Sequence, residues 1–227
     1  MAGSFLASNG MDKDIIEKLV EEFSHFPGVG PRQAKRFAFY LLTRDDEKLK
    51  SFTEMLAKAK KSITHCVSCG RLFVKSDTSE KQPLCRICSD ENREKTLLMV
   101  VGHDVDVESV EKSDSYKGYY FVLGGTIPIL EEKPEKRVRL ANLRKTALER
   151  AQKGLKEIVL ALDANPEGEH TSTYLLKFLF PILKGKDVKI TLLGRGLSTG
   201  TELQYSDPET IKNALQNRAP TEKLSIS

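Results

Sequence analysis

Four cysteines in two C-x-x-C pairs constrain this chain more than any other feature of its sequence. Cys66 and Cys69 form the first pair and Cys85 and Cys88 the second; fifteen residues separate the pairs, and the 227 residues contain no other cysteine. Two residues between thiols let one tight turn present both sulfurs to one ion, and the interval is long enough to return as a hairpin. The spacing predicts one structural Zn²⁺ per chain, held by four thiolates, with no coordination position left open for catalysis.

The alternative use of these cysteines is a pair of disulfides in a secreted domain. Residues 1–10 lack the basic start and the apolar stretch of a signal peptide, so we expect no export, favour zinc, and treat these residues as a flexible leader. The longest uninterrupted apolar run, Phe37–Leu42, is far shorter than a membrane span. We therefore expect a cytoplasmic protein with no membrane partner.

The segment before the cysteines predicts two helices joined by a tight turn. Apolar residues recur at helical spacing from Ile15 to Phe23, and Phe37–Leu42 supplies a second apolar stripe. The turn between them has the sequence Pro-Gly-Val-Gly-Pro over residues 27–31, and a proline is favoured at the first position of a helix. Residues 23–44 contain four arginines or lysines and no acidic residue, so the second helix is expected to be basic.

This pattern resembles the helix-hairpin-helix module of DNA-repair and recombination proteins. Gly28 and Gly30 would let the backbone turn sharply and bring N–H groups close to a phosphate at a helix N-terminus. Arg32, Lys35 and Arg36 would add phosphate contacts, so the module would bind the DNA backbone without reading sequence. The alternative is an ordinary turn beside a solvated basic face, and the net charge of +4 is too small to decide between them.

After the cysteines, the pattern alternates between strands and helices. Such alternation predicts a mainly parallel sheet covered by helices, with ligands at the carboxyl ends of the strands. The expected strands are 97–101, 119–123, 157–163 and 189–193, and the expected helices are 105–112, 137–153 and 171–180, with Pro181 ending or kinking the last. The basic residues of the 137–153 helix are expected to form a solvated face, with a DNA channel as the alternative.

The segment Asp163–Glu169, which follows the third expected strand, resembles the carboxylate motif with which Toprim domains hold magnesium. Carboxylates at strand ends suit a hard cation that stabilises charge on a reacting phosphate. The motif is incomplete here, because Asn165 stands where a second acid would be and Gly102 stands where catalytic Toprim enzymes carry a glutamate. Asp104, two residues further on, and His103 are the candidates to replace it, although neither has the expected place. We expect Asp163, Glu167 and Glu169 to bind a partner or cap the following helix rather than form a catalytic metal centre.

The whole layout resembles the RecR family of recombination mediators over residues 12–218. The resemblance also rests on Tyr116–Gly125, Glu167–Thr171 and Gly194–Leu203, and the last of these carries no phosphate loop, so no nucleotide hydrolysis is expected. The fold class is α/β. The expected segments are a leader (1–10), a helix-hairpin-helix module (11–55), a four-cysteine zinc ribbon (56–93), a Toprim domain (94–195) and a C-terminal Walker-B-like extension with a tail (196–227).

The resemblance implies a non-enzymatic role in DNA repair. RecR-type proteins form ring-shaped homotetramers around DNA and work with RecO, and often RecF, to load RecA onto gapped single-stranded DNA. Two alternatives from other classes stay open at this point. One is a magnesium-dependent Toprim nuclease, which Gly102 disfavours, and the other is a monomeric zinc-ribbon DNA-binding adaptor without a role in recombination.

Overall fold

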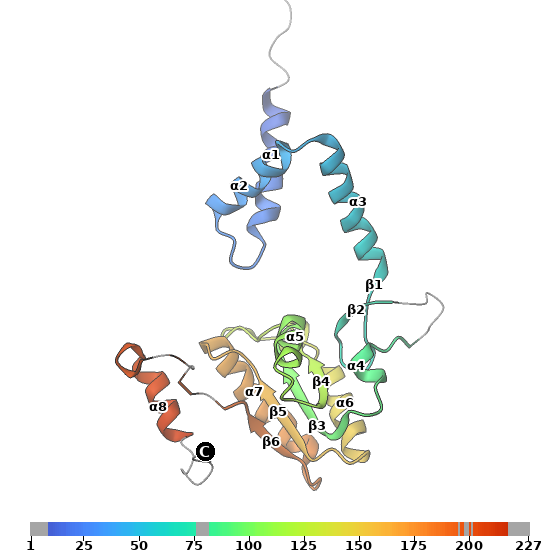
Figure 1. The fold of residues 1–227 in the computed structure, drawn as a ribbon, viewed down its shortest axis with the longest axis vertical. Helices are drawn as coiled ribbons and strands as arrows, with labels where there is room; N and C mark the ends of the chain where they lie inside the picture. Colours follow the sequence, from blue (N-terminus) through green and yellow to red (C-terminus); the bar gives the residue numbers. More distant parts are fainter. Residues whose placement is uncertain (1–8, 76–81, 195, 198–199, 201, 218–227) are drawn as a thin grey trace, which may run out of the picture. The chain divides into compact units, whose positions relative to one another are not determined.

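The computed structural model describes residues 9–75, 82–194, 196–197, 200 and 202–217, which divide into two compact units with the boundary after Ile63 (Figure 1). The expected leader and tail therefore lie largely outside the described residues, as do parts of the Gly194–Leu203 signature. None of the described helices is both long and apolar enough to cross a membrane.

The N-terminal unit is helical. Its helices are α1 (Asn9–Ser24), α2 (Pro31–Leu42) and α3 (Asp46–Ser62). Helices α1 and α2 pack against each other through the ring of Phe23, which makes an edge contact with Phe37, and the small side chains of Ala34 and Ala38 are fully buried beneath them. The helical pair expected from the sequence is confirmed, and α1 begins three residues before the expected Asp12.

The second unit contains a two-stranded hairpin and a four-stranded parallel sheet. Strands β4, β3, β5 and β6 lie in that order, and every neighbouring pair is parallel. The elements in chain order are β1 (Ile63–His65), β2 (Leu72–Val74), α4 (Arg86–Ser89), β3 (Glu94–Val101), α5 (Asp104–Lys112), β4 (Gly118–Val122), the 3₁₀ turn η1 (Pro134–Lys136), α6 (Leu140–Gln152), β5 (Glu157–Ala161), α7 (Pro166–Leu183), β6 (Lys189–Leu192), the 3₁₀ turn η2 (Leu203–Tyr205) and α8 (Pro208–Gln216).

The two faces of this sheet bury different partners, because successive side chains of a strand point to opposite faces. On one face, Leu98 and Val100 of β3 pack in a cluster with the buried leucines of α6 and α7. On the other face, Met99 and Val101 pack with Val107 of α5 and with the four-cysteine segment. Strand β4 and the second half of β3 are therefore buried on both faces, which explains why they read as continuous apolar runs in the sequence.

All four strands expected from the sequence are present, and each ends within two residues of its expected end. Helix α7 differs from the expectation at both ends. It begins at Pro166, five residues before Thr171, and it does not end at Pro181 but runs on to Leu183. A proline in the last turn removes only one backbone hydrogen bond. Leu179 and Leu183, which lie on either side of Pro181 in the sequence, are both buried in the core of the sheet and hold the helix in place.

Candidate functional site

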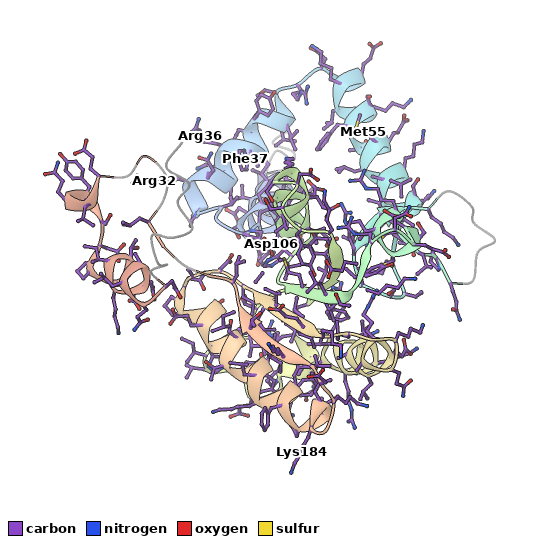
Figure 2. All side chains as sticks on the ribbon, turned by 60° about the horizontal axis from the view of Figure 1, so that its bottom comes forward. Arg32, Arg36, Phe37, Met55, Asp106 and Lys184 are labelled. Carbon is purple, nitrogen blue, oxygen red and sulfur yellow. The ribbon has the colours of Figure 1, made fainter. Side chains whose placement is uncertain are left out.

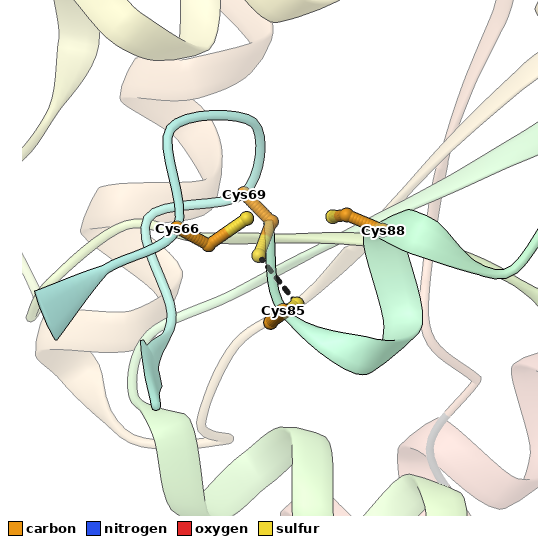
Figure 3. A group of neighbouring side chains, drawn as sticks. All are labelled: Cys66, Cys69, Cys85 and Cys88. Carbon is orange, nitrogen blue, oxygen red and sulfur yellow. Dashed lines mark hydrogen bonds between the residues drawn. The ribbon is translucent and has the colours of Figure 1, made fainter. Parts of the chain in front are cut away.

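The four cysteines converge on one point of the second unit (Figure 3). Their sulfur atoms all lie within 4.8 Å of one another, and the sulfurs of Cys69 and Cys85 are 3.6 Å apart. Four thiolates around one ion at about 2.3 Å would stand roughly 3.8 Å apart, so the observed spacing suits tetrahedral coordination. Cys66, Cys69 and Cys85 are buried and Cys88 is half-buried. This group can therefore hold a metal ion.

Two tight turns bring the sulfurs together, as the C-x-x-C spacing predicts. After β1, the N–H of Gly70 donates to the carbonyl of Cys66 at 2.9 Å. Gly70 needs its positive φ of 74° there, and a side chain at this position would press on the carbonyl oxygen of Val122. At the second pair, Cys85 is the residue before α4, and its carbonyl accepts from the N–H of Cys88 at 2.9 Å.

The four thiols titrate as one group. Hydrogen bonds from the other three cysteines lower the pKa of Cys66 and outweigh the opposing effect of burial. Hydrogen bonds with Cys66, Cys85 and Cys88, together with burial, raise the pKa of Cys69. A bound cation would displace the remaining protons, because thiolates are the metal-binding form of cysteine.

The cysteine segment is fixed to the parallel sheet by backbone hydrogen bonds. The carbonyl of Cys69 accepts from the N–H of Val122 in β4 at 2.7 Å, and the carbonyl of Ser68 accepts from Thr146 Oγ1 in α6 at 3.1 Å. On the hairpin side, the N–H of Leu72 donates to Asp104 Oδ1 at 2.7 Å. The carboxylate of Asp104 is therefore bonded to the hairpin of the cysteine segment. This bond argues against Asp104 as a substitute for a catalytic glutamate.

In the helical unit, the turn between α1 and α2 depends on Gly28. The N–H of Val29 donates to the carbonyl of Phe26 at 3.0 Å, with Pro27 and Gly28 at the two central positions. Gly28 has a φ of 76°, which a glycine adopts without cost, whereas Gly30 has an ordinary φ of −80°. Open space surrounds both glycines, so their backbone is accessible to a ligand.

Arg32, Lys35 and Arg36 are exposed on α2, and Arg32 and Arg36 stand one turn apart at its start (Figure 2). Helix α2 begins at Pro31, and the first N–H groups of a helix have no partner within it. Exposed cations next to a helix N-terminus form a surface that favours an anion. The expected residues are thus exposed beside the expected turn, and their contact with DNA stays a prediction.

At the carboxyl edge of the parallel sheet, β3 ends beside Gly102. The carbonyl of Gly102 accepts from the N–H groups of Gly124 and Gly125 at 2.9 and 3.0 Å, which ties the ends of β3 and β4 together. A side chain at Gly102 would start 3.5 Å from Asp106 Oδ2. That carboxylate accepts from the N–H of His103 at 2.7 Å and closes a capping box at the start of α5. Asp106 is the acidic residue that sequence reasoning missed at this edge.

The carboxylates of Asp163, Glu167 and Glu169 are exposed but do not converge. Glu167 Oε2 accepts from Thr126 Oγ1, on the loop after β4, at 3.0 Å, whereas Glu169 lines a pocket of about 500 Å³ with Asp207 at the start of α8. Asn165 caps α7 by accepting from the N–H of Gly168 at 2.8 Å. Within the described residues, the four cysteines are the one group of metal-type side chains close enough to share an ion.

Arg139 belongs to the basic residues of 137–153 that are expected on a solvated face, but it is half-buried. Its Nη1 donates to the carbonyl of Val122 at 3.0 Å, and its guanidinium lies so close to Gly124 that a side chain there would overlap it. Gly124 also has a φ of 93°. Arg139 therefore links α6 to the end of β4 next to the cysteine segment. Gly124 falls within the Tyr116–Gly125 stretch on which the family resemblance rests.

Together, the units define a helix-hairpin-helix protein whose four-cysteine cluster is seated on a Toprim-type sheet. The model of the family described as "Toprim domain" matches residues 96–194, and that described as "RecR, helix-hairpin-helix" matches residues 16–60. The "Recombination protein RecR" of Streptococcus thermophilus is 36% identical over 204 residues, which cover 89% of this chain and 96% of the relative. That of Oenococcus oeni is 34% identical over 205 residues, covering 90% and 96%. The chain belongs to the RecR family.

Proposed function

We propose that the protein is a recombination mediator in DNA repair. In this role it is a ring-shaped homotetrameric DNA clamp that works with RecO, and with RecF, to load RecA onto gapped single-stranded DNA. Support comes from the match to relatives named as recombination proteins over nearly their whole length. The ring and the partners RecO and RecF are inferred from the family resemblance.

The observation that carries a non-enzymatic role is the carboxyl edge of the sheet. A two-acid metal site needs carboxylates from neighbouring strand ends to converge on one ion. Here β3 is followed by Gly102, which has no carboxylate, and Asp106 is engaged in a capping box. Glu167 is bonded to Thr126, whereas Glu169 lines a separate pocket. The edge retains negative charge without the arrangement that would cut or join a phosphodiester bond.

The proposed DNA contact is the turn before α2. The backbone N–H groups of Gly28, Gly30 and Arg32 would approach a phosphate, and the side chains of Arg32, Lys35 and Arg36 would surround it with positive charge. Their side chains are exposed, and their stretch of chain contains no acidic residue to compete for them. Such contacts recognise the backbone and not the bases, as a clamp that works at any sequence requires.

The proposed metal is Zn²⁺, held by Cys66, Cys69, Cys85 and Cys88. Four thiolates select a soft or borderline cation, and zinc is the usual occupant of a closed tetrahedral set in a non-redox protein. The ion would supply structure: it would fix the two turns that carry the carbonyl of Cys69 to β4.

The acidic group of Asp163, Glu167 and Glu169 is proposed to attract RecO. Exposed carboxylates at the start of α7 can draw a basic protein by electrostatic complementarity, and this requires charge but no metal. Ring closure is proposed to alternate two kinds of two-fold contact, one between helical units and one between Toprim domains, because such alternation closes four subunits.

A RecA-loading assay tests this function. Purified protein, RecO and RecA are mixed with gapped DNA coated by single-strand-binding protein, and the appearance of RecA filaments is followed. We expect loading by the wild type and none by Glu167→Lys/Glu169→Lys, with zinc content and assembly unchanged. Asp187→Lys, at an exposed acid before β6, is the matched control and should load normally. Magnesium-dependent DNA cleavage that disappears in Asp163→Ala would overturn the proposal in favour of a nuclease.

A further inference from the structure

A tight turn on the loop after β4 presents two large apolar side chains to water. The N–H of Glu131 donates to the carbonyl of Pro128 at 3.0 Å, which places Ile129 and Leu130 at the two central positions of the turn. The side chain of Ile129 is 56% exposed and that of Leu130 is 92% exposed. Central turn positions are usually occupied by glycine, asparagine, aspartate, serine or proline. Two neighbouring aliphatic residues there leave apolar area in water that a partner could cover.

The turn is held in place from both sides. Before it, Ile127 is fully buried, and its N–H donates to Thr171 Oγ1 in α7 at 2.8 Å. After it, Glu131 accepts from Arg137 Nε at 2.6 Å and from the N–H of Lys133 at 3.0 Å. Ile129 and Leu130 therefore project from an anchored loop, and their entry into a pocket would cost little conformational entropy.

The base of this loop lies against the acidic group. Thr126 Oγ1 donates to Glu167 Oε2 at 3.0 Å, and Thr171, which anchors Ile127, also donates to the carbonyl of Glu167 at 2.7 Å. The loop that carries the apolar turn is thus hydrogen-bonded at its base to the acidic side chain of Glu167.

The charges near the turn argue against DNA as its occupant. An apolar wedge that opens a base step normally stands among cations that neutralise phosphates. Residues 131–137 contain three acidic and three basic side chains, one of each joined in the Glu131–Arg137 pair, and Glu167 adds a further negative charge. The surface therefore has no positive excess, and it suits a protein whose basic rim surrounds an apolar pocket.

We propose that Ile129 and Leu130 are the apolar anchor by which this protein holds the basic partner that its acidic group attracts. The proposal rests on the proposed function for the identity of that partner and adds the residues that retain it. Long-range attraction by carboxylates raises the rate of association, whereas burial of two aliphatic side chains slows dissociation.

The test measures the affinity of purified RecO from the same organism for the zinc-loaded full chain, at about 0.05 M and about 0.5 M salt. Three variants are compared with the wild type: Ile129→Ser/Leu130→Ser, Glu167→Gln/Glu169→Gln, and Phe180→Ser. Phe180 is 73% exposed near the other end of α7, so it is a matched control for the removal of exposed apolar area. All variants keep the buried residues that hold the fold.

We expect Ile129→Ser/Leu130→Ser to weaken RecO binding about tenfold or more at both salt concentrations, chiefly through faster dissociation. Glu167→Gln/Glu169→Gln should weaken binding at low salt and differ less from the wild type at high salt, because salt screens charges but not apolar contact. Phe180→Ser should bind like the wild type.

Normal RecO binding by Ile129→Ser/Leu130→Ser, with weakened binding in the glutamate variant, would overturn the anchor and leave the proposed function standing. Equally weakened binding in Phe180→Ser would also overturn it. A change in the solution mass or DNA affinity of Ile129→Ser/Leu130→Ser, without a change in RecO binding, would reassign the turn to a second copy or to DNA. A wild type that does not bind RecO would remove the proposed function and the anchor together.

Discussion

The backbone N–H of Val122 donates a 2.7 Å hydrogen bond to the carbonyl oxygen of Cys69. Val122 belongs to β4, which is an edge strand of the parallel sheet, so the first metal-binding turn covers part of an otherwise open edge. The cysteine segment and the sheet also share one apolar cluster, in which Met99, Val101 and Tyr120 contact the cysteines. Order in the cysteine segment and order at the end of β4 are therefore coupled.

Cys69→Ser should remove the metal and loosen β4. Wild-type protein is expected to contain one zinc per chain and the variant well under one, because three thiolates no longer complete the tetrahedral shell. Hydrogen exchange at the Val122 amide should accelerate along with that of the cysteine segment. Val67→Ser, at an exposed residue of the same turn, is the control and should change neither quantity. Wild-type protein with disulfides between these cysteines would contradict the metal assignment.

The strands β3 and β4 were predictable because their residues are buried on both faces of the sheet. Apolar runs such as Leu97–Val101 have no helical period and are bounded by glycine or aspartate, which is sufficient to place a parallel strand. The start of α7 could also have been placed, since Asn165 and Pro166 are a favoured cap and first residue. The expected helix instead starts at Thr171, after the acidic motif, which is five residues too late.

The contacts at the carboxyl edge were not predictable from the sequence. Thr126 and Glu167 are 41 residues apart, and Leu72 and Asp104 are 32 apart, so no local pattern indicates either bond. Glu167 is bonded to Thr126, whereas Glu169 lines a different pocket. Which way each side chain points depends on where α7 begins, and tertiary packing determines that start. The C-x-x-C pairs, in contrast, fix their own geometry because each is a single turn.

Gly168→Ala should destabilise the fold and displace the start of α7. A side chain at Gly168 would overlap the carbonyl oxygen of Asp163, which is backbone and cannot move aside cheaply. We expect a decrease of about 1–3 kcal/mol or more in the free energy of unfolding, measured by urea denaturation. Gly194→Ala, where the space around the residue is open, is the matched control. Equal stability of the two variants would show that Asp163 and α7 can separate freely.

The pair of Arg93 and Glu111 should make stability depend on acid pH. Arg93 Nη1 and Nη2 donate to the two oxygens of Glu111 at 3.0 and 2.6 Å, and the Tyr120 hydroxyl adds a bond at 2.7 Å. Burial by itself would raise the pKa of Glu111, but these hydrogen bonds outweigh it and hold that pKa below its usual value. The contribution to stability is therefore complete above the unfolded pKa of about 4.3 and is lost as pH falls through the lower folded value.

Glu111→Gln should accordingly lower the free energy of unfolding at pH 7 by about 1.5–3 kcal/mol, and its difference from wild type should shrink below about pH 4. Thermal and urea unfolding across pH measure this. Asp187→Asn, in an exposed pair with Lys156, should have little effect at any pH. A difference between Glu111→Gln and wild type that stays constant as the pH falls would argue that the carboxylate charge is not what stabilises the pair.

Arg32→Ala/Arg36→Ala should weaken DNA binding to a similar degree for unrelated sequences. For each phosphate that the variant no longer contacts, the slope of log affinity against log salt should decrease by about one unit. The fold should be unchanged, since both side chains are exposed. Lys48→Ala/Lys50→Ala on α3 removes the same charge elsewhere in the helical unit and serves as the control. Unchanged binding by a folded double variant would move the DNA path to the basic residues of 137–153.

The mass of the protein in solution shows whether four chains close into a clamp, as proposed. Light scattering on zinc-loaded protein at micromolar concentration, with and without DNA, gives that mass without reference to any protein partner. With DNA present, we expect a protein mass of about four times the 25.4 kDa of one chain. A mass of 25.4 kDa under the same conditions would contradict the clamp and leave a monomeric DNA-binding adaptor.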